Sequence, residues 1–477
     1  MAEPTGVDGA HPFARTADVT IARTTDATTT RRTAVASART AEIATVLADA
    51  FLAAEDWAVD ALLAAGTAAV GPHRRFVPMT VLAALRGYPR APRDAPRELA
   101  AFLQSVDGFA EAVRRSAERA PITVASRRAT PTEAPPNTGH VPRIDTVADL
   151  ARLLDLTIGR LEWFADTKQW NRRTHDAVLQ HHGYVWRARP GRVPRLLEVP
   201  KPRLRAVQRT ALDEILTFLP VHDAAHGFVP GRSAVSGAAQ HTGRQAVVTL
   251  DLAHFFAAVS APMVYGLLRR GGLPEPVAHT LTGLCIHVVP PRVIAAMPPG
   301  GTPEDRAALR RALATPHLPQ GAPTSPTLAN ASVWRLDTRL AGWAASADAT
   351  YTRYADDLAF SGDDRFAARV DAFVRGVGRI VTDEGHILNA SKTRVRRRGV
   401  RQSVTGIVVN ERPSVGRAEF DRLKAILHNC AEHGPDGQDR VGVPDFRAHL
   451  RGRVGWFEQV HPERGARLLA EFQRITW

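Results

Sequence analysis

The sequence predicts an α+β protein, because a strand-forming central region lies between two regions with helical periodicity. Apolar residues recur at helical spacing over 41–73 and 97–119, and again beyond residue 416. The apolar runs at 247–250 and 351–360 are short and rich in β-branched and aromatic residues, which is typical of strands. We therefore expect a sheet in the middle of the chain, with helices before and after it.

The N-terminal part divides into three segments by composition. Residues 1–40 are rich in Ala, Thr and Arg and hold almost no large apolar side chain, which predicts a disordered tail. Residues 41–125 are predicted to form a small helical extension, with an Arg- and Pro-rich loop over 71–96. The Pro-rich stretch 126–143 predicts a linker.

The rest of the chain is predicted to hold a sheet domain over 144–415 and a helical domain over 416–477. Within the sheet domain, residues 144–190 are expected to be helical. The Pro- and Arg-rich stretch 290–316 is expected to form a surface loop.

The most informative local feature is Tyr354-Ala355-Asp356-Asp357, because apolar, strand-forming residues flank two adjacent carboxylates. This pattern predicts a β-hairpin with Asp356-Asp357 at its tight turn. Carboxylate oxygens at such a turn suit a hard cation such as Mg2+. Acidic turns are common, however, and most only face water, so the turn alone does not define a site.

A third carboxylate, Asp251, ends the apolar run Val247-Val248-Thr249-Leu250. A carboxylate in an apolar strand is costly unless it is paired or coordinated. If the two segments are neighbouring strands, Asp251, Asp356 and Asp357 converge on one metal cluster. The alternative is a strand-end Asp and a solvated acidic turn.

Between these carboxylates lies LPQGAPTSPTLANAS, residues 318–332. Gly321 lets the backbone approach a flat ligand closely. A helix is expected to start at Pro326 and to run through Leu340, with Ser325 and Thr327 as capping residues. Alone this is an ordinary loop entering a helix, and the order of the three segments is what makes it specific.

In this order the segments resemble motif A (Asp251), motif B (Gln320-Gly321) and motif C (Tyr354 to Asp357) of reverse transcriptases. The resemblance implies a right-hand polymerase fold, with fingers and palm over 144–415 and a thumb over 416–477. It also implies that the three Asp are catalytic and bind two Mg2+ ions, together with the Leu252 backbone carbonyl. Mn2+ would suit the same oxygen ligands. The ions would activate a 3′-hydroxyl and stabilise the leaving pyrophosphate.

Further residues would hold the incoming dNTP. The segment 196–209 resembles the fingers of this family, so Lys201, Arg203 and Arg205 are candidates for triphosphate or template contact, with a solvated basic strand as the alternative. Phe256 lies where the family places a bulky side chain under the sugar, which would exclude a ribose 2′-OH; the alternative is a core aromatic. Gln320 and Gly321 complete this predicted nucleotide site.

Several details resemble the bacterial retron branch of the family. Gly237-Ala238-Ala239-Gln240-His241 is similar to the retron signature Asn-Ala-x-x-His, with Gly237 in place of Asn, and Val404-Thr405-Gly406 matches the second signature. His241, Val404, Thr405 and Gly406 are therefore predicted to bind RNA. Lys392 lies in a segment that resembles motif D, so it would protonate pyrophosphate or hold the triphosphate; the alternative is a solvated lysine.

Membership of the retron branch would imply a dedicated structured non-coding RNA as both primer and template. Synthesis would start from the 2′-OH of a branching guanosine and leave a branched RNA–DNA product, multicopy single-stranded DNA. The resemblance also implies antiphage defence with a toxic effector encoded nearby. Because the chain stops after the predicted thumb, template removal is expected to need a host RNase H.

Three other functions remain open from the sequence. One is a group II intron-like reverse transcriptase that lacks its maturase domain, against which Val404-Thr405-Gly406 argues. Another is a diversity-generating enzyme, which tends to carry Gln where Pro326 stands. The last is a structural RNA-binding subunit that senses phage, although binding alone does not require three converging carboxylates.

Composition agrees with a polyanion-binding enzyme, because the formal net charge is +14 and basic residues cluster in 192–209 and 392–401. The two cysteines, Cys285 and Cys430, have no spaced partners, which excludes a disulfide framework and a Cys-based zinc site. There is no apolar stretch of transmembrane length and no signal-peptide core. We therefore expect a cytoplasmic protein without a membrane partner.

Overall fold

The computed structural model describes residues 37–93, 95–124, 142–166, 170–174, 176, 178–440 and 442–477. The predicted tail before residue 37 and most of the predicted linker lie outside this range. The chain divides into two compact units, residues 1–135 with 274–276, and residues 136–273 with 277–477. Helices and strands both occur, so the predicted α+β class is confirmed.

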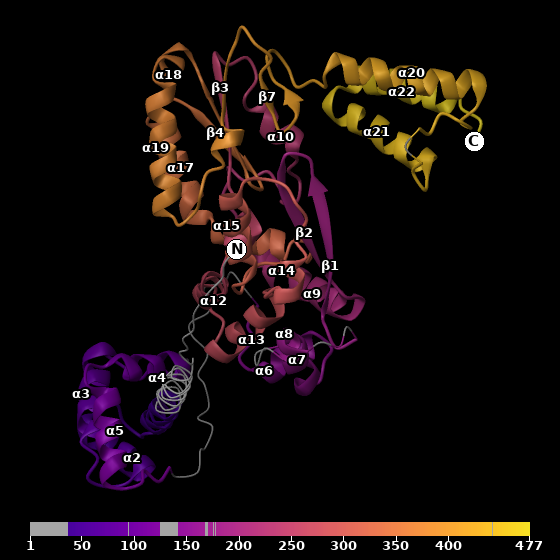
Figure 1. Ribbon diagram of the computed structural model, residues 1–477. Coiled ribbons are helices and arrows are strands. Elements are labelled where there is room, and N and C mark those ends of the chain that lie inside the picture. Colours follow the sequence, from indigo (N-terminus) through magenta and orange to yellow (C-terminus); the bar gives the residue numbers. More distant parts are fainter. Residues whose placement is uncertain are drawn as a thin grey trace, which may run out of the picture. The chain divides into compact units, whose positions relative to one another are not determined.

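The first unit is helical. A helix over 37–52, which begins inside the predicted tail, is followed by α2 (Val59–Val70), α3 (Phe76–Gly87), α4 (Pro96–Ser105) and α5 (Phe109–Arg119) (Figure 1). The predicted loop over 71–96 is therefore wrong, because α3 occupies its middle. Phe76, Val81 and Ala84 are buried at helical spacing, and Pro78 lies in the first turn, where a missing N–H costs nothing.

The sheet of the second unit positions the candidate site. Its four antiparallel strands lie in the order β4 (Thr350–Tyr354), β5 (Asp357–Gly362), β3 (Ala246–Asp251) and β6 (Arg394–Arg397). Successive side chains of a strand face opposite sides, so Val248 and Phe360 enter one core while Val247 and Ala359 enter another. Both faces of the central strands are therefore buried, which explains their continuous apolar runs.

Helices cover the sheet. The core that holds Val248 and Phe360 also contains Leu340 of α17 (Trp334–Ala345) and Phe373 of α19 (Val370–Asp383), and Figure 1 shows both helices next to the sheet. The short helix α18 (Asp364–Ala368) contacts β5 and β3. The core that holds Val247 contains Ala238 of α10 (Ala234–Ala239).

Short helices and a long hairpin precede the sheet. The elements are α6 (Val147–Leu153), α7 (Ile158–Ala165), α8 (Trp170–Arg173), β1 (His182–Arg189), β2 (Arg192–Pro200), α9 (Pro202–Glu214) and η1 (Leu216–Phe218). The helical expectation for 144–190 therefore fails at β1, whose alternating Tyr184 and Trp186 are half-buried against the core beside β2.

The segment between β3 and β4 is mostly helical. It contains α11 (Phe255–Ala258), α12 (Ala261–Arg270), α13 (Glu275–Cys285), α14 (Pro291–Ala295), α15 (Pro303–Leu313) and α16 (Ser325–Ser332). The predicted surface loop over 290–316 is wrong, because Met297, Leu309 and Leu313 form a small core with Leu196 of β2. The long helix expected from Pro326 to Leu340 is instead two helices that meet at Val333.

The C-terminal part begins with η2 (Ala390–Lys392), β6, β7 (Ser403–Val404) and β8 (Ile407–Val408). Three helices follow where helical periodicity predicts them, α20 (Arg417–His433), α21 (Phe446–Val460) and α22 (Pro462–Gln473), and Figure 1 shows them packed together. Among the helices of the described ranges, none is long and apolar enough to cross a membrane.

Candidate active site

The predicted hairpin exists, but its turn lies one residue earlier than expected. Tyr354 pairs with Asp357, so the two turn residues are Ala355 and Asp356, and Asp357 is the first residue of β5. Ala355 has a φ of 54°, a left-handed conformation that is uncommon for a residue with a Cβ. The turn therefore has to be held by its surroundings.

The structure brings the three predicted carboxylates together. Asp251, at the end of β3, lies opposite Asp357 in the antiparallel register. The Leu252 N–H donates to the Asp356 carbonyl at 2.9 Å. This bond ties the residue after β3 to the hairpin turn, and the role of the Leu252 carbonyl as a metal ligand stays a prediction.

The carboxylates disfavour one another's ionisation. Burial and the charges of Asp356 and Asp251 raise the pKa of Asp357 to about 6. Burial and the Asp251 charge also raise the pKa of Asp356, while Lys392 opposes both shifts. Three negative groups held this close give a site that gains stability from a cation.

Lys392 supplies one positive charge to this cluster. Its Nζ contacts Oδ1 of Asp251, which is 5% exposed, whereas Lys392 keeps 30% exposure. Backbone bonds bring the segment there: Asn389 N–H donates to the Asp251 carbonyl at 2.7 Å, and Ala253 N–H to Ile387 at 2.7 Å. Lys392 is therefore not a merely solvated lysine, because its ammonium lies in the carboxylate site.

The residues fit a divalent metal in their chemistry. Within the described ranges, no three His, Cys, Asp or Glu side chains are already arranged around a metal position. The three carboxylates nevertheless provide the hard oxygen ligands that Mg2+ prefers. The raised pKa values of Asp356 and Asp357 and the Lys392 ammonium on Asp251 both indicate a position that favours positive charge.

A buried ion pair that the sequence analysis missed supports the turn. Arg353 of β4 is fully buried and binds both carboxylate oxygens of Asp337 at 2.8 and 2.7 Å. Its Nη1 also donates to Asn330 Oδ1 at 2.9 Å and to the Ala355 carbonyl at 3.1 Å. The arginine therefore holds the left-handed residue of the turn, and an Arg inside an apolar strand was the signal that could have revealed it.

A pocket of about 420 Å³ gathers several predicted nucleotide-binding residues. Phe256, Gly321 and Arg205 line it, together with Phe228 and Arg209, which sequence analysis missed. The remaining lining residues are Ala322, Pro323, Ser325 and Pro326. Phe256 is half-buried in α11, so it is neither a strand residue nor a pure core aromatic.

Two predicted basic residues are not in this lining. Lys201 lies between β2 and α9, as the N-cap residue of the helix, and donates from Nζ to the Val178 carbonyl at 3.2 Å. Arg203 lies exposed on α9 outside the pocket. Lys201 precedes α9 and Arg203 lies in its first turn, because Pro202 begins the helix. Neither residue is on a strand, and their predicted contact with triphosphate or template stays a prediction.

The motif B segment is fixed against β2. The Glu198 N–H donates to the Gln320 carbonyl at 2.8 Å, and Gly321 has a φ of 131° and would place a Cβ 3.1 Å from the Glu198 carbonyl oxygen. The buried His317 ring pairs with the Glu198 carboxylate at 3.1 Å. Burial lowers the pKa of His317 and the Glu198 carboxylate raises it, and the net pKa is raised. Gly321 thus allows the motif B backbone to lie close to the β2 backbone, while its predicted close approach to a flat ligand stays a prediction.

The β1–β2 hairpin contributes arginines that the sequence analysis did not single out. The Asp251 and Asp356 charges act on Arg189, whose pKa is lowered by burial and by its neighbours Arg195 and Arg192. Arg195 in turn lowers the pKa of Asp356. These guanidinium groups are therefore within electrostatic range of the carboxylates, and the Arg-rich pattern of the hairpin was the available signal.

The predicted RNA-binding residues require correction. His241 is fully buried, with its ring nitrogens 2.7 Å from the hydroxyls of Ser361 and Thr352, and burial lowers its pKa to about 3. Val404 is also buried, in the core. Neither side chain can touch RNA in this structure; His241 instead ties the C-terminal end of α10 to the sheet.

The other two signature residues form an exposed turn. Thr405 and Gly406 connect β7 and β8 with φ values of 49° and 85°, as a two-residue hairpin turn with two positive φ angles requires. Gly406 is exposed and Thr405 half-buried, so both remain candidates for RNA contact.

Gly237, which replaces the signature Asn, has a packing reason. A Cβ at this position would lie 3.2 Å from the ring of His226, which is bonded to Ser236 at 2.8 Å and to Gln240 at 2.9 Å. The histidine ring therefore occupies the space beside this position of α10.

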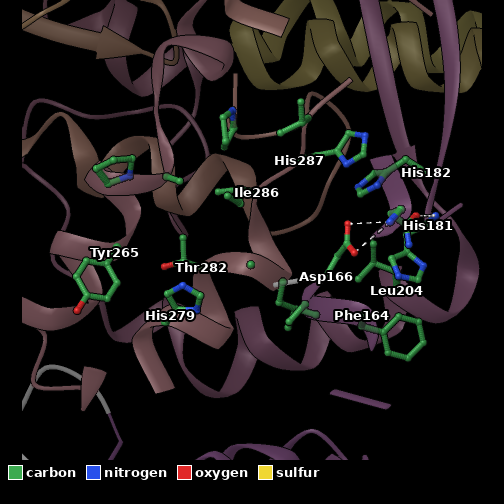
Figure 2. A pocket seen from close by; sticks show the side chains of 18 residues that line it. Phe164, Asp166, His181, His182, Leu204, Tyr265, His279, Thr282, Ile286 and His287 are labelled. Atoms are coloured by element: carbon green, nitrogen blue, oxygen red, sulfur yellow. Dashed lines mark hydrogen bonds between the residues drawn. The ribbon is translucent and has the colours of Figure 1, made fainter. Parts of the chain in front are cut away.

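A second pocket, of about 410 Å³, contains none of the predicted site residues. His182 and His287 stack at its edge with ring centroids 4.0 Å apart (Figure 2). Burial lowers the pKa of both. The nitrogens of His182 are sealed from solvent and have no partner among the described residues, so they offer no reachable group to a ligand.

The comparisons with known proteins match this arrangement. A family model described as reverse transcriptase (RNA-dependent DNA polymerase) matches residues 190–409, which include all three carboxylates. The class of the protein is therefore that of RNA-directed DNA polymerases.

The curated relatives are more specific. The retron Mx65 reverse transcriptase of Myxococcus xanthus is 41% identical over 331 residues, covering 68% of this chain and 70% of the relative. The retron Mx162 enzyme of the same organism is 35% identical over 70% of this chain and 67% of its own length. The retron Ec86 enzyme of Escherichia coli is 26% identical over 60% and 78%. The chain belongs to the retron reverse transcriptases.

Proposed function

We propose that this enzyme copies part of a dedicated structured non-coding RNA into branched, multicopy single-stranded DNA. The observation that carries the proposal is the convergence of Asp251, Asp356 and Asp357 at one end of the sheet in a chain of the retron family. The RNA would be both primer and template, and dNTPs the substrates. We assign fingers to 144–243, palm to 244–415 and thumb to 416–477.

The three carboxylates and the Leu252 carbonyl would hold two Mg2+ ions. When bound, the ions would lower the pKa of the attacking hydroxyl and stabilise charge on the leaving pyrophosphate. Lys392, already on Asp251, would move to the departing phosphate and give it a proton or hold it. Arg189 and Arg195 of the β1–β2 hairpin would attract the triphosphate toward the carboxylates.

The pocket between α9, α11 and the motif B segment would take the nucleotide itself. Phe256 would lie under the sugar and exclude a ribose 2′-OH, Gly321 would allow close approach, and Arg205 would bind phosphate. The exposed turn Thr405-Gly406 and the arginines of β6 would bind RNA, mainly through backbone and shape. Such binding weakens steeply with salt.

We further propose that the enzyme acts in the cytoplasm in antiphage defence. The RNA–DNA–enzyme complex would restrain a toxic effector encoded nearby, and host RNase H would remove the copied template. The support is membership of the retron family alone.

Co-expression with its upstream DNA tests the proposed product. Several hundred upstream nucleotides would be included, and small nucleic acids isolated with and without RNase treatment. We expect a discrete DNA band that shifts after RNase treatment and is absent from the Asp356→Asn/Asp357→Asn variant. Synthesis on a generic RNA template with a DNA primer, but no such band, would contradict the dedicated RNA while leaving the polymerase intact.

A further inference from the structure

Phe228 has a backbone conformation that a bulky residue rarely adopts. Its φ is 61°, in the left-handed region where the Cβ is crowded. The preceding residues are bound to the catalytic hairpin: Arg353 N–H donates to the Ala224 carbonyl and His226 N–H to the Arg353 carbonyl, both at 2.7 Å. Asn330 Nδ2 also donates to the Gly227 carbonyl at 2.8 Å.

Gly227 shows how tightly this segment lies on the turn. A Cβ at Gly227 would come within 2.7 Å of the Ala355 backbone nitrogen, so only glycine permits this approach. The next residue, Phe228, has to leave the hairpin from there. Such strain persists where the surrounding structure imposes it, and it concentrates at functional sites.

The strained backbone directs an aromatic ring into the nucleotide pocket. Phe228 is 47% exposed and lines the pocket with Phe256 and Gly321. Its ring centroid lies 6.2 Å from that of Phe256 and 6.3 Å from that of Tyr354. Phe256 meets Phe255 at 5.4 Å and Phe228 in the pocket, so two neighbouring rings limit its movement.

We propose that Phe228 is a specificity-determining residue that acts through Phe256. It holds the Phe256 ring in the rotamer that lies under the sugar of the incoming nucleotide, and thereby enforces the exclusion of ribonucleotides. The inference rests on the proposed function, in which Phe256 is the residue that excludes the 2′-OH. Without the Phe228 ring, Phe256 can rotate into the vacated space and admit a ribose.

Single-nucleotide incorporation on an RNA template with a DNA primer tests this role. The kcat/KM ratio for dNTP over rNTP would be measured for the wild type, Phe228→Ala, Phe256→Ala and the double variant. We expect a loss of selectivity of about 100-fold for Phe256→Ala and about tenfold for Phe228→Ala, mainly through a lower KM for rNTP. The double variant should match Phe256→Ala, because the two residues act as one unit.

Two further variants separate this role from misfolding. Phe228→Tyr keeps the ring and should keep the selectivity. Phe228→Gly removes the ring but also the backbone strain, so its Tm should equal or exceed that of the wild type while selectivity falls as in Phe228→Ala. Phe218→Ala is the matched control, since Phe218 is 53% exposed and outside the pocket lining, and it should change nothing.

The outcomes distinguish two failures. If Phe256→Ala leaves the selectivity unchanged, the sugar-excluding role in the proposed function is wrong. If Phe256→Ala loses selectivity while Phe228→Ala and Phe228→Gly retain it, the present inference alone is overturned. Losses that multiply in the double variant would show that Phe228 acts independently of Phe256, which also contradicts the inference.

Discussion

Two groups of charged side chains meet at the β4–β5 hairpin, and the structure treats them in opposite ways. Arg353 and Asp337 are both fully sealed from solvent, and both oxygens of the carboxylate are bound by the guanidinium. Asp251, Asp356 and Asp357 carry like charges, and Asp357 is exposed at the open end of the strand. The first group is electrostatically satisfied, whereas the second leaves two pKa values raised.

The difference assigns distinct roles to the two groups. A buried ion pair contributes little net stability but is costly to break, so its use here is to fix geometry, through the bond from Arg353 to the Ala355 carbonyl. The unsatisfied carboxylates form the site that a cation completes. The residues that give rigid support and those that carry excess negative charge are thus separated by only a few positions of one hairpin.

The largest effect is expected at the unsatisfied group. Asp356→Asn should reduce DNA synthesis on an RNA template about a thousandfold or more, because it removes a ligand of the proposed ions, whose stabilisation is worth several kcal/mol. Its Tm in the presence of a chelator should not fall, since a repulsive charge is lost. Asp371→Asn, an exposed change on α19, serves as control. Retained synthesis in Asp356→Asn would contradict the assignment.

A substitution in the buried Arg353–Asp337 pair should first lower the stability of the fold. Arg353→Met leaves the buried Asp337 carboxylate without a countercharge, with only the Tyr351 hydroxyl still donating to it at 2.7 Å, which should lower the free energy of unfolding by about 3–5 kcal/mol. Replacing both residues, as Arg353→Met/Asp337→Leu, should recover much of that loss in urea unfolding. DNA synthesis should stay reduced in the double variant, because the Ala355 carbonyl loses its donor. Equal stability of the single and double variants would contradict a buried uncompensated charge.

The sequence could predict the features that local pattern and order determine. The two strands, the hairpin and the three carboxylates follow from apolar runs interrupted by Asp251 and Asp356-Asp357. The turn was misplaced by one residue, because Asp-Asp is the stronger turn pattern, whereas the register that pairs Tyr354 with Asp357 is fixed by β3. Helices α3, α14 and α15 were read as loops, because their Pro and Arg content hid buried faces.

Tertiary partners were beyond the sequence. Arg353 finds Asp337 on a separate helix 16 residues earlier, and no local pattern connects the two. His241 and Val404 were assigned to RNA from signatures, but signature positions do not reveal burial, and both side chains lie inside the protein. The sequence could not single out Phe228, because its backbone conformation follows from the close packing of Gly227 on Ala355, which is a tertiary contact.

Lys392 bears on the same comparison, because it is a positively charged side chain in contact with the carboxylate group, at Asp251. Lys392→Met should reduce synthesis about 100-fold if its ammonium donates a proton. Lys392→Arg keeps the charge but cannot give up a proton near neutral pH. If Lys392 donates a proton, this variant should be as slow as Lys392→Met. If Lys392 only holds the phosphate, Lys392→Arg should recover activity. Single-turnover rates would be compared, and wild-type rates in both variants would remove Lys392 from the mechanism.

The smallest expected effect is the pH dependence of stability without metal. The pKa of Asp357 is raised to about 6 from 3.8, so the folded protein holds this proton more tightly than the unfolded chain. The corresponding stability is present at low pH, declines as the pH rises from about 4 to 6, and is lost above that. Because the Asp357 carboxyl is only partly buried and solvent still screens it, the change should be smaller than that of Arg353→Met.

Urea unfolding in a chelator between pH 4.5 and 7.5 measures this decline. The wild type should lose more stability over this range than Asp357→Asn, and the difference between the two isolates this carboxyl from other titrating groups. Ions that compete with the proton should bind more tightly above pH 6, so the Mg2+ concentration that half-protects the wild type should fall as the pH rises. If the stability of the two proteins changed with pH in the same way, the neighbouring carboxylates would not raise the pKa of Asp357. The carboxylate group would then differ from the Arg353–Asp337 pair in geometry alone.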